Sequence, residues 1–202
     1  MLWMITDFSK TPGLEETVKH ISICLQNGVQ KVSLRNIGVF DSDSIKKIKE
    51  ELDRSFPDRE IYIHNIAAEE VNKYNHLHYP SNRTAEAFEI KNKYPDVKVV
   101  VSTHSRYEYE KAFKNGVDYA LFSPVYPPIS KPEDTRNTVT PVKFKNLYLL
   151  GGIDRMKALW LIERGFTNIA GISLFYGENA ASVIKELSTL IMEKEYGIAY
   201  SD

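Results

Sequence analysis

Cysteine is almost absent from this sequence of 202 residues, and Cys24 is its single example. An internal disulfide is therefore excluded, which is compatible with a reducing compartment. Cys24 lies in the apolar run 21–25, where a small buried hydrophobic side chain is favoured over the alternative of a catalytic thiol. The first seven residues are too short a stretch for a signal peptide and lack its basic residues. We expect a cytoplasmic protein.

Long apolar runs and blocks of like charge are missing as well. No apolar run reaches the roughly 20 residues that span a bilayer, so we expect no membrane segment. The formal net charge is −1, and Lys46, Lys47 and Lys49 are followed directly by Glu50 and Glu51. This pattern indicates a solvated helix face and gives no support to a nucleic-acid partner.

What the sequence does contain is an ordinary globular composition, with 43% apolar and 26% charged residues. Disorder is not expected at these values. The length suits one domain, and no linker or low-complexity segment interrupts it. We expect residues 1–202 to form a single domain.

Short apolar runs alternate with stretches of helical periodicity along nearly the whole chain. Strands are expected at residues 2–6, 31–35, 60–63, 75–78, 98–102, 119–122, 147–150 and 168–171. Helices are expected at residues 14–26, 42–53, 67–73, 84–93, 106–115, 155–163 and 180–192. Strict alternation predicts parallel strands joined by right-handed crossovers. About eight repeats favour a single closed (β/α)8 TIM barrel over an open sheet.

Turn residues agree with these boundaries. Gly28, Gly116 and Gly165 each follow an expected helix and precede a strand, where a left-handed glycine ends a helix. Ser42 is a candidate N-cap for the second helix. Residues 123–145 hold five prolines and no helical pattern. Long loops in compact domains are usually functional, so this segment is interpreted as a lid or substrate loop, with a degenerate helix as the alternative.

Two glycine turns after the last two expected strands suggest a phosphate site. The first holds Gly151 and Gly152, and the second holds Gly171, Ile172 and Ser173. Glycine lets the backbone approach a ligand closely, and the free N–H groups at the start of the following helix can bind an anion. Barrels often bind phosphate with these two loops. The alternative, that the glycines serve only tight packing, is less favoured for the pair.

Five further side chains are candidates for chemistry. Ser102 and His104 follow an expected strand and would present a hydroxyl and an imidazole at the barrel mouth. Arg35 ends another strand, where it could contact a phosphate or form a structural ion pair. Ser130 and Lys131 lie in the proline-rich loop, where a cation could close over a diphosphate. The alternative for His104 and Lys131 is an ordinary exposed residue.

Taken in order, these motifs resemble the thiamine phosphate synthase family, together with its thiazole tautomerase branch. The similarity covers nearly the whole chain. Its most specific part is Ser-Pro-Val-Tyr-Pro-Pro-Ile-Ser-Lys at residues 123–131, which is similar to Gly-Pro-Ile-Phe-Pro-Thr-x-Thr-Lys in the family. The resemblance implies a TIM barrel and a place in thiamine biosynthesis.

The resemblance also implies a reaction and a set of residues. The family's synthases join hydroxymethylpyrimidine diphosphate to a thiazole phosphate and release pyrophosphate, by a proposed dissociative route. The implied catalytic residues are Ser102, near the reacting centre, and Lys131. The implied substrate-binding residues are Arg35, Asn65, His104, Ser130, Gly151, Gly152, Gly171, Ile172 and Ser173. Arg35 and Lys131 would hold the diphosphate, and the glycine turns would hold the thiazole phosphate.

The sequence departs from the family where a metal ion is expected. Ser33 and Ile37 replace a glutamine and a lysine of the second strand. Asn65 stands where the third strand is followed by a magnesium-binding aspartate, and Arg83 stands at the second such aspartate. A neutral amide is a poor substitute for a carboxylate on magnesium. We therefore expect no protein ligands for Mg²⁺, although the diphosphate itself could carry the ion.

Three functions remain open. The first is a synthase with an altered diphosphate pocket. The second is a tautomerase-like isomerase, although Pro124 replaces that branch's histidine and cannot transfer a proton. His64, His78 or His104 could take over that role. The third is a binder of a thiamine-pathway phosphate without turnover. Each implies a small phosphorylated partner, and a homo-oligomer is left open.

Overall fold

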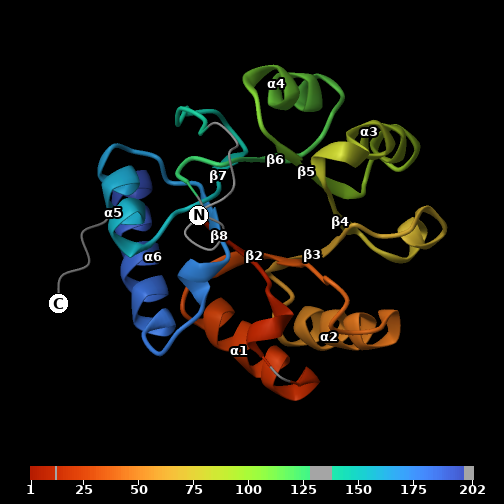
Figure 1. The fold of residues 1–202 in the computed structure, drawn as a ribbon, viewed down its shortest axis with the longest axis horizontal. Coiled ribbons are helices and arrows are strands. Elements are labelled where there is room, and N and C mark those ends of the chain that lie inside the picture. The colour runs from red at the N-terminus through yellow and green to blue at the C-terminus, as the bar shows by residue number, and fades with distance from the viewer. Residues whose placement is uncertain (12, 128–137, 198–202) are drawn as a thin grey trace. The chain divides into compact units, whose positions relative to one another are not determined.

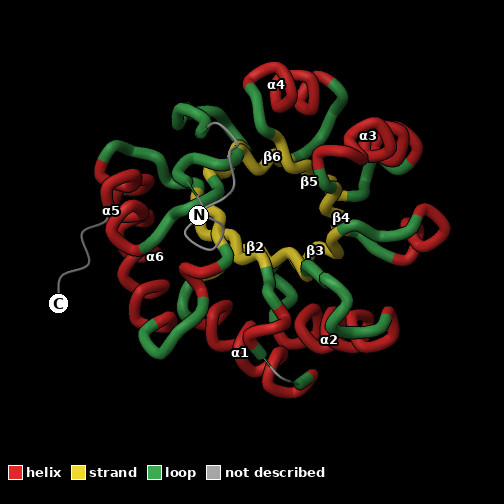
Figure 2. The backbone as a smooth tube through the Cα atoms, viewed as in Figure 1, coloured by secondary structure: helices red, strands yellow, loops and turns green. Residues whose placement is uncertain are grey.

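The computed structural model describes residues 1–11, 13–127 and 138–197 of the chain. Eight strands form a closed barrel in their sequence order, with helices outside it (Figures 1 and 2). The strands are β1 (Leu2–Ile5), β2 (Val29–Leu34), β3 (Glu60–His64), β4 (His76–Tyr79), β5 (Lys98–Thr103), β6 (Tyr119–Phe122), β7 (Leu147–Leu149) and β8 (Ile169–Gly171). This confirms the predicted (β/α)8 TIM barrel.

The connections hold six α-helices among the described residues, and short 3-10 helices. The α-helices are α1 (Leu14–Gln26), α2 (Ser42–Ser55), α3 (Thr84–Lys93), α4 (Arg106–Lys114), α5 (Arg155–Glu163) and α6 (Ala180–Tyr196). The 3-10 helices are η1 (Phe8–Lys10), η2 (Ala68–Lys73), η3 (Ser81–Arg83) and η4 (Ser173–Phe175). No helix within the described ranges combines the length and apolar character that a membrane crossing requires.

Two local predictions were wrong. The helix expected at 67–73 is the 3-10 helix η2, a short segment with Val71 buried at 2% exposure and little other apolar surface to pack. Ser42 is the first residue of α2 and not its N-cap. Asp41 caps the helix, because its carboxylate accepts the Ser44 N–H at 2.8 Å. A carboxylate at this end also complements the helix dipole.

The glycines predicted to end helices have the expected backbone. Gly28, Gly116 and Gly165 have φ angles of 119°, 78° and 79°, in the region that favours glycine. The proline-rich segment also follows the prediction where it is described: 123–127 and 138–145 contain no helix or strand. Its role as a lid stays a prediction.

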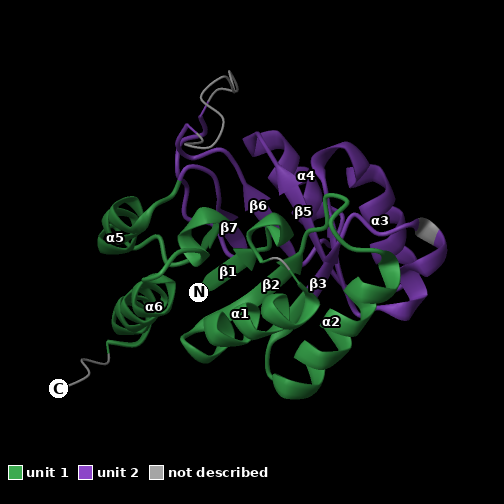
Figure 3. Cartoon of the chain, turned by 60° about the horizontal axis from the view of Figure 1, so that its bottom comes forward, with its two compact units in different colours: residues 1–61, 153–202 green, residues 62–152 purple. Residues whose placement is uncertain are grey.

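By its internal contacts the chain divides into two compact units, coloured separately in Figure 3. Unit 1 comprises residues 1–61 and 153–202, and unit 2 comprises residues 62–152. In unit 1, β1 pairs in parallel with β2 and with β8, and α1 packs against α2 and α6. The single domain expected over 1–202 stays a prediction.

In unit 2 the strands present two distinct faces. The Tyr109 ring of α4 packs edge-on against Phe122 of β6 at 5.2 Å between centroids. Phe122 and its register partner Thr103 therefore face the helices. Because side chains alternate along a strand, Ser102 points to the opposite face, which a closed barrel encloses. The candidate site is built on that face.

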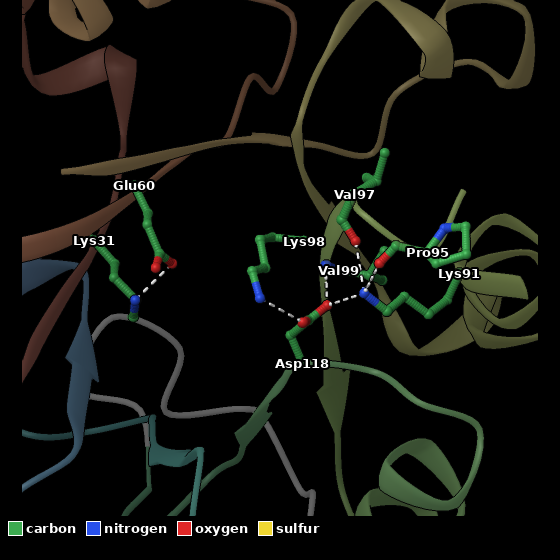
Figure 4. A network of polar contacts seen from close by, with 8 residues as sticks. All are labelled: Lys31, Glu60, Lys91, Pro95, Val97, Lys98, Val99 and Asp118. Carbon is green, nitrogen blue, oxygen red and sulfur yellow. Dashed lines mark hydrogen bonds and ion pairs between the residues drawn. The ribbon is translucent and has the colours of Figure 1, made fainter. Parts of the chain in front are cut away.

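Ion pairs and hydrogen bonds of charged side chains lie near the amino ends of strands (Figure 4). In unit 1, the Lys31 ammonium lies 2.5 Å from Glu60, and Lys31 is only 5% exposed. In unit 2, Asp118 precedes β6 and accepts hydrogen bonds from Lys98 and from the Val99 N–H. The Lys91 ammonium also lies 2.9 Å from Asp118. The amino ends of barrel strands serve stability, whereas chemistry belongs to the carboxyl ends.

Candidate functional site

A histidine and a serine meet at the carboxyl ends of β4 and β5 in unit 2. His78 Nε2 lies 3.0 Å from Ser102 Oγ, and His78 is 2% exposed. The ring of His64, at the end of β3, packs edge-on against His78 at 4.5 Å between centroids. An imidazole at this distance can accept or donate a proton at Ser102 Oγ. The contact therefore holds the Ser102 oxygen in place, and Ser102 can donate its own O–H to a ligand when His78 Nε2 carries the proton.

His104 lies just beyond the end of β5 and is also held in place. Its Nδ1 is 2.8 Å from the carbonyl oxygen of Ser123, and its backbone N–H donates to Glu108 Oε2 at 2.7 Å. A carbonyl can only accept, so Nδ1 carries the proton in this contact. Nε2 of a neutral His104 is then an acceptor, available for proton transfer.

Asn65 and Arg83 meet beside the same strand ends. Arg83 Nη1 donates to Asn65 Oδ1 at 2.8 Å, and its Nε donates to Glu86 Oε2 at 2.8 Å. A further hydrogen bond joins Arg83 Nη2 to Glu86 Oε1. The backbone of Asn65 has φ of 58°, and its N–H donates to the carbonyl of His78 at 2.8 Å. Asn65 is exposed and Arg83 is partly exposed.

These residues do not fit a divalent metal ion. Magnesium prefers charged oxygen ligands, whereas this position offers one amide oxygen that already accepts a hydrogen bond from a guanidinium. The hydrogen bond from Arg83 to Glu86 raises the pKa of Arg83, so the group stays positively charged and repels cations. No cluster of His, Cys, Asp or Glu within the described part of the chain has the arrangement of a metal site.

The first glycine turn is packed tightly against the segment that follows β6. Gly151 and Gly152 have φ angles of 101° and 61°. A Cβ on Gly151 would lie 2.7 Å from Pro124 Cα, and one on Gly152 would lie 2.5 Å from the Pro127 oxygen. Packing alone therefore explains glycine here, as the alternative interpretation held. Anion binding by Gly151 and Gly152 stays a prediction.

The helix after this turn differs from the expectation of free amides. The carboxylate of Asp154 caps α5 by accepting the Lys157 N–H at 2.9 Å. Burial would raise the pKa of Asp154, but hydrogen bonds from Lys157 outweigh it and keep the pKa low. Asp154 is thus ionised at neutral pH. A carboxylate of the protein therefore already accepts from one of the first N–H groups of α5.

The second turn, in unit 1, has the opposite character. Ser173 is exposed and begins η4, and no side chain caps this 3-10 helix. The first amides of a helix have no acceptor inside it, so the backbone N–H groups at this turn can bind a ligand. Gly171 ends β8, where a Cβ would lie 3.3 Å from Leu174 Cβ. The backbone of Ile172 joins the strand to the turn.

A tyrosine holds this turn in place. Tyr176 Oη accepts the Asp7 N–H at 2.8 Å, which connects the end of η4 to the loop after β1. The His20 ring stacks on Tyr176 at 4.7 Å between centroids, and His20 Nε2 lies 2.9 Å from the Phe175 oxygen. Burial raises the pKa of Tyr176 to about 12, so the phenol stays neutral. The position of η4 therefore depends on the contacts of Tyr176 with His20 and Asp7.

Arg35 follows β2 in unit 1. Its backbone N–H donates to Thr6 Oγ1 at 2.8 Å, and Thr6 is fully buried. Within the described ranges, the Arg35 guanidinium has no hydrogen bond or ion pair, and the choice between a phosphate contact and a structural ion pair stays open. Ser33 accepts a hydrogen bond from the Trp3 indole at 2.9 Å, and Ile37 is exposed. Arg35 is the charged candidate on this strand end.

Cys24 is a buried core residue. It has no exposed surface, and its Sγ lies 3.8 Å from the carbonyl oxygen of Phe175. Burial raises the pKa of Cys24 to about 12, so the thiol is not ionised at neutral pH. The interpretation as a small hydrophobic side chain is confirmed.

The predicted site residues fall into three groups. Unit 2 holds Asn65, Ser102, His104, Gly151 and Gly152 at or beyond strand carboxyl ends, and unit 1 holds Arg35, Gly171, Ile172 and Ser173 in the same way. Ser130 and Lys131 lie outside the described residues.

Sequence reasoning missed two contacts. It named His78 only as a substitute acid or base and did not predict its hydrogen bond with Ser102. It treated Arg83 only as the position of a missing aspartate and did not predict its hydrogen bond to Asn65. The available signal was that the carboxyl ends of adjacent parallel strands meet at one edge.

Solved structures of the same fold include enzymes of thiamine metabolism. The thiamine phosphate pyrophosphorylase from Pyrococcus furiosus is 21% identical, with 96% of each chain covered and a TM-score of 0.74. The thiamine phosphate pyrophosphorylase from Bacteroides thetaiotaomicron is 17% identical, with 96% of each chain covered and a TM-score of 0.59. At these identities the likeness shows the fold alone.

Other enzymes share the fold without sharing that name. The 3-keto-L-gulonate-6-phosphate decarboxylase from Vibrio cholerae O1 biovar El Tor is 10% identical, covers 93% of this chain and 95% of its own, and has a TM-score of 0.64. No curated protein matches the sequence significantly.

The sequence itself supplies the assignment. The family model described as thiamine monophosphate synthase matches residues 2–175, which run from the first strand to the end of η4. That range includes the Asn65–Arg83 contact, the His78–Ser102 pair and the turn at Ser173. The chain therefore belongs to the thiamine monophosphate synthase family.

Proposed function

We propose that this protein is a transferase of thiamine biosynthesis that joins hydroxymethylpyrimidine diphosphate to thiazole phosphate. The single observation that carries the proposal is the match of the thiamine monophosphate synthase family model to residues 2–175, a range that includes the exposed turn at Ser173. The amides of this turn suit the phosphate of the thiazole substrate. The substrate is thus a small phosphorylated molecule, and a homo-oligomer and a cytoplasmic location stay predictions.

The chemistry needs charge stabilisation at the departing group more than a nucleophile from the protein. The bond between the pyrimidine methylene carbon and the diphosphate oxygen breaks, and pyrophosphate leaves with the bonding electrons. The thiazole nitrogen then forms a bond to that carbon. Arg35 and Lys131 would contact the pyrophosphate, because cations stabilise the negative charge that develops there. Ser102, oriented by His78, would donate a hydrogen bond near the reacting centre.

The decisive experiment is a synthase assay with both substrates, run with magnesium and with EDTA. We expect thiamine phosphate and pyrophosphate in equal amounts. Arg35→Ala should lower kcat/KM at least tenfold, whereas Arg54→Ala, at an arginine with a 74% exposed side chain on α2, should not. No product under either condition would refute the proposal.

One observation favours a second candidate, the thiazole tautomerase. His104 Nδ1 lies 2.8 Å from the backbone oxygen of Ser123, directly before the Pro124 that replaces the tautomerase histidine. His104 would then carry the proton. Purified protein should interconvert thiazole carboxylate tautomers in EDTA, and His104→Gln should abolish the absorbance change. A flat trace with the wild-type protein would eliminate this candidate.

The third candidate, a binder without turnover, has a calorimetric signature. It would bind thiazole phosphate or thiamine phosphate with no product in either assay. Ser173→Asp should abolish that affinity, because a carboxylate would repel the phosphate at the turn.

A further inference from the structure

The two positions where the family carries metal-binding aspartates are occupied by residues that bond to each other. Asn65 follows β3, Arg83 ends η3 after β4, and the two strands are parallel neighbours. The 2.8 Å hydrogen bond from Arg83 Nη1 to Asn65 Oδ1 joins them. A positive charge has therefore replaced one carboxylate, and its hydrogen-bond acceptor has replaced the other.

The guanidinium of Arg83 is held in a fixed orientation. Glu86, one turn along the chain, accepts from both Nε and Nη2. The guanidinium also lies over the ring of Tyr79, 5.4 Å from its centroid, and Tyr79 is fully buried. A rigid ring on one side and a carboxylate on one edge reduce the freedom that Arg83 would otherwise lose on binding a ligand.

Donors remain for that ligand. A guanidinium has five N–H groups, and three of them are used by Asn65 and Glu86, which leaves two. Arg83 is not sealed off, since a quarter of its side chain is exposed. A planar fork of this kind matches phosphate oxygens and carries the same sign of charge as a metal ion.

We propose that Arg83 takes the place of the divalent ion in this chain and binds the diphosphate of the substrate directly, so that this binding requires no magnesium. The inference rests on the proposed function, which supplies the diphosphate. Asn65 and Glu86 are positioning residues, since they act by orienting the guanidinium. The charge of Glu86 offsets part of the attraction, so the affinity for a diphosphate is moderate.

The test uses inorganic pyrophosphate as the probe and isothermal titration calorimetry on the full chain. The wild-type protein is titrated in EDTA and again in excess magnesium chloride. We expect binding in EDTA, with an affinity within about threefold of that in magnesium. Arg83→Gln should weaken binding in EDTA at least tenfold, which corresponds to about 1.4 kcal/mol.

Arg106→Gln is a matched control in the same unit. Arg106 is the first residue of α4 and pairs with a glutamate of that helix, Glu110, at 2.7 Å, much as Arg83, directly before α3, pairs with Glu86 of α3. The affinity of the Arg106→Gln variant for pyrophosphate should equal that of the wild type. Thermal melting of each variant checks folding. If Arg83→Gln is unfolded, Arg83→Lys is titrated in its place. Its ammonium keeps the charge but cannot bridge Asn65 and Glu86 in the same geometry, so pyrophosphate should bind more weakly than to the wild type.

A double variant tests the reverse change, from the arginine back to metal-binding carboxylates. The double variant Asn65→Asp with Arg83→Asp restores both carboxylates, and it should bind pyrophosphate only when magnesium is present. Three results would overturn the inference: wild-type binding that needs magnesium, an Arg83 variant that binds as tightly as the Arg106 control, or no pyrophosphate binding at all. The synthase assay separates the two proposals, because product formation supports the function, while pyrophosphate binding in EDTA decides the role of Arg83.

Discussion

Ser102 Oγ lies 3.0 Å from Nε2 of His78, a histidine with 2% exposure on the neighbouring strand. The oxygen of Ser102 is therefore held in place before any substrate arrives, and its O–H can point to a ligand when His78 Nε2 is the donor. Positioned donors contribute to catalysis because their orientation costs nothing at the moment of reaction.

Ser102→Ala should lower kcat for thiamine phosphate formation about tenfold, because one oriented hydrogen bond is worth about 1–1.5 kcal/mol. Steady-state kinetics would measure kcat and KM separately. Ser105→Ala is the control: Ser105 caps α4 by accepting the Glu108 N–H at 3.2 Å. That variant should lose about 1 kcal/mol of stability with kcat intact. Equal kcat in the two variants would contradict a role for Ser102.

Gly152→Ala should destabilise the protein by about 2–4 kcal/mol, since a Cβ would meet the Pro127 oxygen at 2.5 Å and the backbone is left-handed. Gly177→Ala isolates the backbone contribution. Gly177 has φ of 108°, and no described atom lies within 4 Å of the position that a Cβ would take. We expect that variant to lose only about 1 kcal/mol. Urea unfolding would measure both; similar losses would show that packing at Gly152 is unimportant.

Asp118→Asn should lower the free energy of unfolding by about 2 kcal/mol at pH 7, because hydrogen bonds to a charged group are lost. Burial would raise the pKa of Asp118, but hydrogen bonds from Lys91, Val99 and Lys98 hold it below the ordinary 3.8. Because the pKa of Asp118 is lower in the folded protein, its carboxylate stabilises the fold at pH values above 3.8, the pKa in the unfolded chain. This stabilisation is lost as the pH falls through the lower pKa of the folded state.

The difference between wild type and Asp118→Asn should therefore shrink below about pH 4. Urea unfolding between about pH 5 and the acid limit of folding would show it. Asp58→Asn, in an exposed turn, should change stability by less than about 0.5 kcal/mol. A difference at Asp118 that stayed constant with pH would contradict the assigned contacts.

Cys24 should resist alkylation by iodoacetamide at about pH 8 in the native protein, because burial raises its pKa to about 12 and the thiolate is the reactive form. Labelling should become rapid in concentrated urea. Mass spectrometry at timed intervals measures both rates. Native labelling as fast as that of the unfolded chain would show that Cys24 is reachable in the folded state.

Much of the barrel was predictable because its elements have strong local signals. The bounds expected for α1, α3, α5 and β6 agree with the structure residue for residue. Apolar runs between left-handed glycines leave little freedom in where such strands begin and end. The α-helix predicted at 67–73 was wrong because the spacing of its residues is typical of a helix, while Val71 alone supplies little apolar surface to pack.

The site was less predictable because it depends on contacts between different connections. Strand order places Asn65 and Arg83 near each other, but the hydrogen bond between them requires the left-handed backbone of Asn65 and the turn η3. No periodicity encodes either feature. The packing reason for Gly152 likewise depends on where the Pro127 oxygen lies, which the prolines alone do not determine.

The segment after β6 and the turn after β7 are joined by two backbone hydrogen bonds, from Val125 to Leu150 at 2.9 Å and from Tyr126 to Gly151 at 3.1 Å. Together with the glycine packing, they couple the two connections mechanically. A displacement of one would carry the other with it. A change of length between Phe122 and Tyr126 would therefore break this pairing unless the turn after β7 changed with it.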